Sequence, residues 1–507
     1  MRINFILQKE KCLLTKIYKK KMSELNLEPK IVFDFFDEIC KIPRASKHEE
    51  LISAYLQEFG KKLGYETIAD EAGNVLIKKP AFPGYENCKT VILQSHMDMV
   101  CDKRPDVEHD FSKDPIKTYV DGEWLKASGT TLGADNGIGV AAQMAVLADK
   151  DMRHGPVNCL FTIDEETGLT GAEVLAPSML DGDILLNLDS EDEGEIFIGC
   201  AGGVCTYADY KFMWTPIAGD LFFFKVEISG LTGGHSGDDI NKERANANKL
   251  LNRFLCQVAD KYEFYLCDID GGSLHNAIPR DASAVFAVQS ADKESVRIDF
   301  NLFAADVQEE YAVTEPNARF LLQSTDPCGR AIEKKSAMGL LKSIHAVFNG
   351  VFAMSQDVPG LVETSSNLAS VKKSSENVIS VVASQRSAIV SARENVAHTV
   401  AAALELGGAK VRHSGGYPGW KPNPRSQILE VAGDVYRDLY GEEIKVKAIH
   451  AGLECGLFLE KAPHLDMISF GPTMRGVHSP DEKLNIPSVE KFWKHLVALL
   501  EKAPAKN

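Results

Sequence analysis

The sequence predicts an α/β protein built on a mixed sheet, with a smaller two-layer α+β domain inserted into it. Residues 91–98 (VILQSHMD) begin as an apolar run without polar alternation, which is typical of a strand buried on both faces. Residues 157–163 and 184–188 repeat this pattern, and each is followed at once by an acidic residue. After about residue 203, strands and helices follow in an order typical of a separate domain.

Length and composition limit the class of protein. The 507-residue chain is too long for one hydrophobic core, so we expect two or more domains. Its hydrophobic fraction of 44% is ordinary for a globular protein, and no apolar run is long enough to span a bilayer. The net charge of −16 argues against nucleic acid as a partner. The 11 cysteines are scattered and include no CxxC pair, which indicates a reduced, cytoplasmic protein.

We expect residues 1–21 to be a disordered extension. Six lysines lie in this segment, most of them after a short apolar stretch, whereas a signal peptide has its charge first and a longer apolar core. The main domain is predicted to comprise residues 22–202 and 401–507. The inserted domain is predicted to comprise residues 203–400.

The main domain is predicted to begin with amphipathic helices at 30–42 and 47–63, the first of which ends before Pro43. The Gly-rich segment 133–139 allows a tight turn into an Ala-rich helix at 140–147. The remaining elements are strands at 66–69, 75–78, 91–100, 157–163, 184–188 and 467–470, a helix that starts after residues 451–456, and a helix at 488–502.

The inserted domain is predicted to follow a β-α-β-β-α-β order, as two-layer folds do. Its strands are expected at 221–229, 282–288, 296–303 and 378–385, and its helices at 246–259 and 331–348.

Five candidate metal ligands follow predicted strands, start a helix or lie in the last loop. They are His96, Asp135, Glu166, Asp189 and His478. Because open α/β sheets place their sites at the carboxyl ends of the strands, we expect these side chains to converge. Nitrogen and oxygen donors without thiolate suit Zn²⁺ or Mn²⁺. Clustered carboxylates also repel one another, and one or two dications would remove that cost.

Each of these segments has a simpler interpretation when it is taken alone. Asp135 could be an ordinary helix N-cap. Residues 164–166 could be a solvated acidic turn. If the chain is extended there, adjacent side chains point apart, and one carboxylate can bind a cation while its neighbour faces a reactive water.

Several motifs resemble those of the M20 family of dinuclear zinc peptidases. They are His-Met-Asp (96–98), Gly-Ala-Asp-Asn-Gly (133–137), Asp-Glu-Glu-Thr-Gly (164–168), Asn-Leu-Asp-Ser-Glu (187–191) and His-Ser-Pro (478–480). Three longer strings are similar to the aminoacyl-histidine dipeptidase branch of that family: Gly-Gly-His-Ser-Gly (233–237), His-Asn-Ala-Ile-Pro-Arg (275–280) and His-Ala-Gly-Leu-Glu-Cys-Gly (450–456). The resemblance runs from about residue 30 to the C-terminus.

This resemblance implies a role for each metal ligand. His96 and Asp189 would hold one ion, Glu166 and His478 the other, and Asp135 would bridge the two. Asp98 would orient His96 through its second ring nitrogen. Glu165 would be the general base that activates a hydroxide held between the ions.

The resemblance also implies roles in the inserted domain, which would be a lid and dimerisation domain. His235 would stabilise the oxyanion in a partner subunit's site. Asn276 and Arg386 would hold the substrate, with Arg386 pairing its C-terminal carboxylate. From the residues alone, His235 could be a plain loop residue and Arg386 a surface charge.

The implied activity is that of a metal-dependent dipeptidase that acts on unblocked dipeptides, Xaa-His among others. The implied cofactors are two divalent ions, Zn²⁺ first, with Mn²⁺ and Co²⁺ as alternatives. The implied assembly is a homodimer. An N-acyl amino acid amidohydrolase on the same site is the alternative. A binding protein without activity is disfavoured, because it would not need Glu165 and Asp98. The role of Glu454 is left open.

Overall fold

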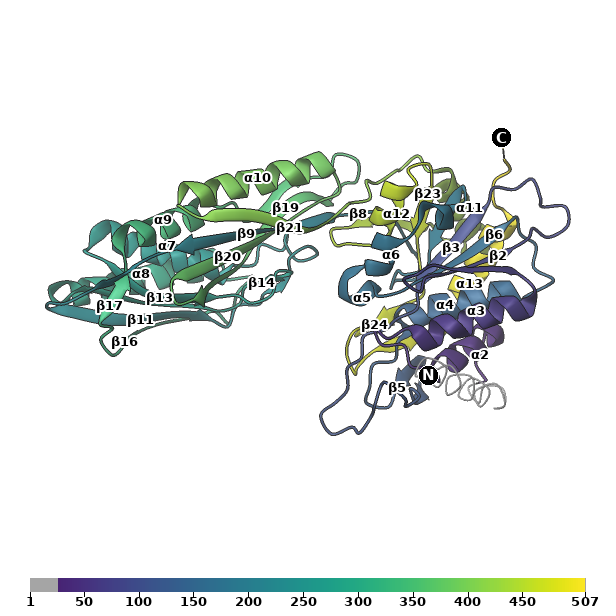
Figure 1. Ribbon diagram of the computed structural model, residues 1–507, viewed down its shortest axis with the longest axis horizontal. Coiled ribbons are helices and arrows are strands. Elements are labelled where there is room, and N and C mark those ends of the chain that lie inside the picture. Colours follow the sequence, from purple (N-terminus) through teal and green to yellow (C-terminus); the bar gives the residue numbers. More distant parts are fainter. Residues whose placement is uncertain (1–25, 507) are drawn as a thin grey trace, which may run out of the picture. The chain divides into compact units, whose positions relative to one another are not determined.

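The computed structural model describes residues 26–506 and separates into two compact units, each described here by itself. The first unit contains the chain up to Gly199, together with Asn423–Ala448 and the chain from Leu457 onward. The second unit contains Cys200–Pro422 and Ile449–Gly456. Figure 1 shows the elements of both. The predicted extension at 1–21 lies outside the described residues.

The first unit is organised around an eight-stranded mixed sheet in the order β1-β2-β6-β3-β7-β23-β8-β22. Strand β3 is parallel to β6 and β7, and β7 is parallel to β23, whereas the pairs β1/β2, β2/β6 and β23/β8 are antiparallel. The strands are β1 (Glu66–Ala69), β2 (Val75–Lys79), β3 (Val91–His96), β6 (Val157–Thr162), β7 (Ile184–Asn187), β8 (Glu195–Cys200), β22 (Lys445–Ile449) and β23 (Asp466–Ser469).

Strand β3 lies inside this sheet, and all six of its residues are buried. Its one amide, Gln94, is satisfied by its neighbours: its Oε1 accepts from Asn187 Nδ2 at 2.6 Å and its Nε2 donates to Thr162 Oγ1 at 3.1 Å. The register pairs His96 with Thr162 and Gln94 with Asn187, so β3, β6 and β7 end at one edge. Residues that directly follow these strands therefore emerge together.

Helices cover this sheet with apolar side chains. In α2 the buried residues are Val32, Phe33, Phe36 and Ile39, which form one helical face. Figure 1 shows α2, α3 and α4 side by side. The longer helices of the unit are α2 (Lys30–Ile39), α3 (Glu50–Leu63), α4 (Ala134–Ala148), α11 (Gln427–Tyr440) and α13 (Ile486–Glu501). The shorter ones are α5 (Glu165–Gly168), α6 (Thr170–Val174), the 3₁₀ turn η1 (Pro177–Leu180) and α12 (Cys455–Lys461).

A small four-stranded sheet in the order β24-β25-β5-β4 completes the first unit. Its strands are β4 (Thr118–Asp121), β5 (Trp124–Ala127), β24 (Met474–Arg475) and β25 (Lys483–Asn485).

The second unit contains a nine-stranded antiparallel sheet in the order β16-β11-β15-β13-β19-β20-β9-β21, with β18 paired to β19. Its strands are β9 (Gly202–Lys211), β11 (Leu221–Ser229), β13 (Tyr265–Gly271), β15 (Ala282–Gln289), β16 (Arg319–Ser324), β18 (Gly350–Met354), β19 (Val362–Ser375), β20 (Val378–Ser387) and β21 (Lys410–Tyr417). Two further ribbons pair β10 (Trp214–Pro216) with β17 (Arg330–Ile332) and β12 (Gly234–His235) with β14 (Ala277–Ile278).

Four long helices share a hydrophobic core with this sheet, so the unit has two layers (Figure 1). They are α7 (Ala247–Lys261), α8 (Lys293–Glu310), α9 (Lys334–Ala346) and α10 (Val390–Leu406). Among residues 26–506, no helix combines the length and apolar character needed to cross a bilayer.

One predicted element is wrong, because residues 296–303 belong to helix α8 and not to a strand. The alternation of apolar residues in this segment favours a strand, but the buried residues are Val296, Phe300, Phe303 and Val307, which recur at helical spacing. Ile298 and Leu302, which strengthen the alternation, are 61% and 59% exposed. The predicted β-α-β-β-α-β order is therefore also wrong.

The second unit extends past residue 400, where the sequence places the end of the inserted domain. Strand β21 pairs antiparallel with β9 from Lys410 onward, and this pairing keeps the segment within the second unit.

Candidate metal centre

The five predicted metal ligands come together at the carboxyl edge of the main sheet. His96 ends β3, Asp189 follows β7, and Glu166 lies in α5, shortly after β6. Asp135 lies in the first turn of α4, and His478 lies between β24 and β25. Their ligand atoms form two groups, each with all atoms within 4.8 Å of one another. The groups are His96, Asp135 and Asp189, and Asp135, Glu166 and His478.

Asp135 belongs to both groups and faces an imidazole with each oxygen. Nε2 of His96 lies 3.1 Å from Asp135 Oδ1 and 3.3 Å from Asp189 Oδ1. Nε2 of His478 lies 3.1 Å from Asp135 Oδ2 and 2.9 Å from Glu166 Oε2. The arrangement is therefore two imidazole–carboxylate sets that share one carboxylate.

Asp98 contacts both the His96 ring and the turn that carries Glu165 and Glu166. Its Oδ1 lies 3.3 Å from His96 Nδ1, the ring nitrogen that faces away from Asp135. The same carboxylate accepts from the backbone N–H groups of Glu165 at 3.1 Å and Glu166 at 3.3 Å. Ser46 Oγ donates to it at 2.8 Å. Asp98 thus connects the orientation of the His96 ring to the position of the Glu165–Glu166 turn.

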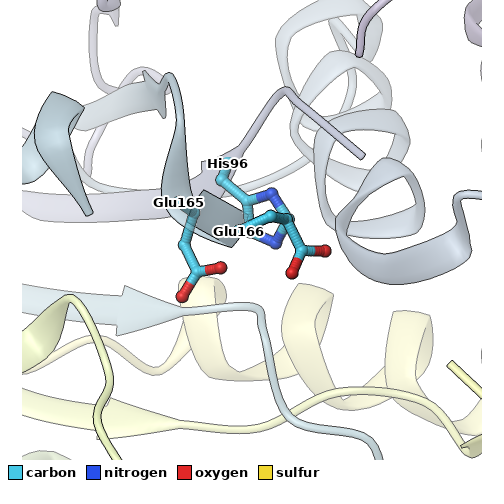
Figure 2. A group of neighbouring side chains, drawn as sticks. All are labelled: His96, Glu165 and Glu166. Atoms are coloured by element: carbon cyan, nitrogen blue, oxygen red, sulfur yellow. The ribbon is translucent and has the colours of Figure 1, made fainter. Parts of the chain in front are cut away.

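In Figure 2 the carboxylates of Glu165 and Glu166 lie to different sides of the His96 ring. The turn that carries them is the short helix α5, not the extended chain considered from the sequence. Their carboxylates nevertheless point in different directions, and an oxygen of each lies within 4.8 Å of a His96 nitrogen. The turn can therefore present one carboxylate as a ligand and the other as a base.

The charges of the site depend on one another. Burial lowers the pKa of His96, but Asp189, Asp135 and Asp98 outweigh it and hold this pKa well above 6.5. Hydrogen bonds to Asp135 and Glu166 raise the pKa of His478 to about 11.

Burial raises the pKa of a carboxyl group, whereas it lowers the pKa of a histidine. Burial raises the pKa values of Glu166 and Asp189. It also raises the pKa of Asp135, but the two imidazoles outweigh burial and bring this pKa below its ordinary value. These carboxylates need positive charge beside them, and without it they would repel one another.

The donor set fits two divalent cations. It consists of imidazole nitrogens and carboxylate oxygens without a thiolate, which suits Zn²⁺ and similar metals. Glu166 Oε1 is buried and has no hydrogen-bond partner among the described residues, as expected of a ligand oxygen. Two dications would neutralise the clustered carboxylates in place of the two protonated rings.

A second group of predicted site residues lies in the second unit. Arg386, at the end of β20, is 7% exposed, and its Nη2 lies 3.3 Å from Nε2 of His235. The guanidinium also donates to Tyr417 Oη at 2.9 Å and Ser236 Oγ at 3.4 Å. The backbone carbonyl of Asn276 accepts from Ser236 at 2.8 Å, and the Asn276 residue itself is exposed. Glu454, of open role, is fully buried at the start of α12.

Several residues that contact the backbone or side chains of the candidate site were not predicted from the sequence. Arg44 and Ser46 lie in the α2–α3 connection and contact the Asp98 segment, with Arg44 Nη1 donating to Asp98 O at 2.9 Å. Glu482, shortly after His478, binds the backbone around Asp135. Only the proximity of Glu482 to His478 in the sequence could have indicated it.

Comparison with known proteins identifies the family. Residues 92–502 match peptidase family M20/M25/M40. The chain is also 43% identical over 486 residues to the cytosol non-specific dipeptidase of Escherichia coli K12, covering 96% of this chain and 100% of that relative. The chain belongs to peptidase family M20. The resemblance inferred from the motifs is therefore confirmed.

Two solved structures have the same fold as this chain. Aminoacylhistidine dipeptidase from Vibrio alginolyticus is 43% identical, and its structure superposes with a TM-score of 0.89, covering 97% of this chain and 100% of that one. Aminopeptidase PepT from Bacillus cereus, 16% identical with a TM-score of 0.55, covers 94% of this chain and 99% of its own and shares the fold. The predicted α/β class, with a mixed main sheet and a separate α+β domain, is confirmed.

Proposed function

We propose that this protein is a cytosolic metal-dependent dipeptidase that hydrolyses the peptide bond of unblocked dipeptides, Xaa-His among others. The observation that carries the proposal is the pair of imidazole–carboxylate sets that share Asp135. Likeness to a non-specific dipeptidase and an aminoacylhistidine dipeptidase, over nearly the full length of both relatives, supports the substrate class.

Two divalent ions, most suitably Zn²⁺, are the proposed cofactors. His96 and Asp189 would hold one, Glu166 and His478 the other, and Asp135 both. When bound, the ions supply Lewis-acid polarisation of the scissile carbonyl and make a water acidic enough to attack at neutral pH.

Glu165 is the proposed general base. Its carboxylate lies beside the His96 ring and on another side of it from Glu166, so it can face the attacking water while Glu166 binds metal. Glu165 takes the proton from that water and later gives it to the leaving amine, so the protons balance over the cycle. Asp98 holds the His96 ring and the backbone of Glu165 in the geometry that this transfer needs.

The second unit, which contains the predicted insertion at 203–400, is the proposed lid and dimerisation domain. The Arg386 guanidinium would pair with the C-terminal carboxylate of the dipeptide, and Asn276 would assist it. His235 would donate to the oxyanion of the tetrahedral intermediate in the partner protomer's site. The hydrogen-bond distances between Arg386, His235 and Tyr417 support a preformed polar group of this kind.

A substrate panel tests the proposal. Purified protein with Zn²⁺ should hydrolyse Ala-His and β-Ala-His much faster than an N-acetyl amino acid or a tetrapeptide, because a closing lid limits substrate length. Faster turnover of the N-acetyl amino acid would favour an N-acyl amidohydrolase instead. Equal rates on dipeptides and tetrapeptides would contradict the lid.

A further inference from the structure

Glu482 is a buried carboxylate beside the metal centre that the proposed reaction does not use. It lies between β24 and β25, shortly after His478, and it is 3% exposed. Both of its oxygens face residues 132–135, where α4 begins. An anionic side chain in so buried a place needs compensation from its surroundings.

The backbone of the Asp135 segment supplies that compensation. Oε2 of Glu482 accepts from the N–H groups of Leu132 at 2.7 Å and Gly133 at 2.9 Å. Oε1 accepts from Ala134 at 2.8 Å and Asp135 at 3.4 Å. Consecutive N–H groups that converge in this way form an anion-binding concavity, and hydrogen bonds to an ionised carboxylate are among the stronger ones. Glu482 therefore accepts hydrogen bonds from four successive backbone N–H groups where the chain enters α4, and the last of them belongs to Asp135.

Arg44 contacts the same segment through one carbonyl group and joins it to the Asp98 segment. Nη2 of Arg44 donates to Gly133 O, and Nη1 donates to Asp98 O at 2.9 Å. Gly133 adopts φ +68°, and a Cβ at this position would lie 2.4 Å from Arg44 Nη2, so no other residue fits without displacing the arginine. The N–H groups and a carbonyl of this turn are thus both fixed by charged side chains.

We propose that Glu482 is a positioning residue of the metal centre, which fixes the Asp135 backbone so that each Asp135 oxygen faces one metal position. The inference rests on the proposed function, in which Asp135 is the shared ligand. Loss of the hydrogen bonds to Glu482 would let the Asp135 carboxylate move relative to His96 and His478. Both ions, and not one, would then bind more weakly.

The substitution E482Q tests this directly. Glutamine has the same shape, but its amide nitrogen cannot accept from backbone N–H groups. We expect Zn²⁺ affinity at both positions to fall about 10- to 100-fold, as for other partners of metal ligands. The measurement is titration of metal-free protein with Zn²⁺ against a competing chelator, with circular dichroism to establish that the variant is folded.

The matched control is E195Q. Glu195, on strand β8, is also a buried carboxylate of the first unit, and its Oε2 lies 2.6 Å from Nζ of Lys447 on strand β22. E195Q should bind both ions with wild-type affinity. Wild-type affinity in E482Q, even with a lowered melting temperature, would show a purely structural role and overturn the proposal. Equal losses of affinity in both variants would also overturn it.

If E482Q does not fold, E482D carries the test, because aspartate keeps the charge and both acceptor oxygens but is one methylene shorter. We expect weaker binding of both ions by a smaller factor, and unchanged affinity would overturn the proposal. Wild-type protein measured in parallel distinguishes a failure of the proposed function from a failure of the role proposed for Glu482. If the wild type binds no Zn²⁺, the proposed function fails. If it binds two ions and E482Q or E482D does so equally well, only the role of Glu482 fails.

Discussion

Nε2 of His478 lies 3.1 Å from Oδ2 of Asp135, although the two residues come from distant parts of the sequence. The other oxygen of Asp135 lies at the same distance from Nε2 of His96. One carboxylate thus faces both imidazoles. Loss of this shared carboxylate should affect both proposed ions, whereas loss of an unshared ligand should affect only one, and the metal content per chain measures the difference.

We predict that D135A loses both ions, whereas H478A loses only one. Asp135 belongs to both ligand groups, and His478 belongs to one. Metal content per chain after dialysis, measured by atomic emission, should be near zero for D135A and about half of the wild-type value for H478A. If D135A retained as much metal as H478A, Asp135 would not be a shared ligand.

We predict that E165Q retains its metal but loses about 10²- to 10⁴-fold in kcat, which is the usual contribution of a general base. Glutamine keeps the size of the side chain but cannot take the proton. E173Q is the matched control, because Glu173 is an exposed residue of the neighbouring helix α6. Near-normal kcat in E165Q would rule out its role as the base.

We predict that R386A raises KM for dipeptides about 10- to 100-fold, which corresponds to the loss of a hydrogen bond to a charged group. The effect should depend on the substrate carboxylate. A dipeptide with a C-terminal amide should bind weakly to the wild type and lose little more in R386A. If the amide substrate were affected as strongly as the acid, Arg386 would act through the packing of Tyr417 and Ser236 instead.

We predict that H235A lowers kcat about 10²- to 10³-fold, as expected when an oxyanion donor is removed. Its metal content should be unchanged, because His235 lies in the second unit and outside both ligand groups. H345A is the control, since His345 is an exposed histidine of the same unit. Equal kcat values for the two variants would contradict the assignment.

We predict that His495 makes the protein sensitive to acid. Burial lowers the pKa of this histidine to about 4, and its ring packs against Phe470 and Tyr436. In the unfolded chain the pKa is about 6.5, so the unfolded state binds more protons between these values and stability falls as pH falls. From pH 7 to pH 5 this histidine should account for a loss of about 2 kcal/mol in the free energy of unfolding.

Urea denaturation of metal-free wild type and H495Q at both pH values measures this contribution. The variant lacks the titrating ring, so its stability should fall less between pH 7 and pH 5. Identical losses in the two proteins would show that His495 is not responsible.

The clustering of the candidate metal ligands could be predicted because each lies where the local pattern changes. A buried strand that begins as an unbroken apolar run, such as β3, can be recognised in the sequence, and a polar residue at its end is conspicuous. The same holds for Asp189 after β7, and the Gly-rich entry to α4 indicates Asp135. Parallel strands then bring these ends to one edge without further information.

Other features could not be predicted, because they depend on contacts distant in sequence. Helix α8 has alternating apolar residues, and only packing against the second-unit core decides that Phe300 and Phe303 are buried while Ile298 is exposed. Glu482 resembles a solvated loop acid until the turn at Leu132–Asp135 folds around it. In the same way, nothing in the local pattern around Arg44 connects it to the carbonyl groups of Asp98 and Gly133.

The most direct test is a Zn²⁺ titration of metal-free protein during turnover of Ala-His. The shared ligand set predicts that the metal-free protein is inactive and that hydrolysis reaches its plateau at about two equivalents of Zn²⁺ per chain. Hydrolysis that persists without metal, or that reaches its plateau at about one equivalent of Zn²⁺ per chain, would contradict a two-ion centre built on His96, Asp135, Glu166, Asp189 and His478.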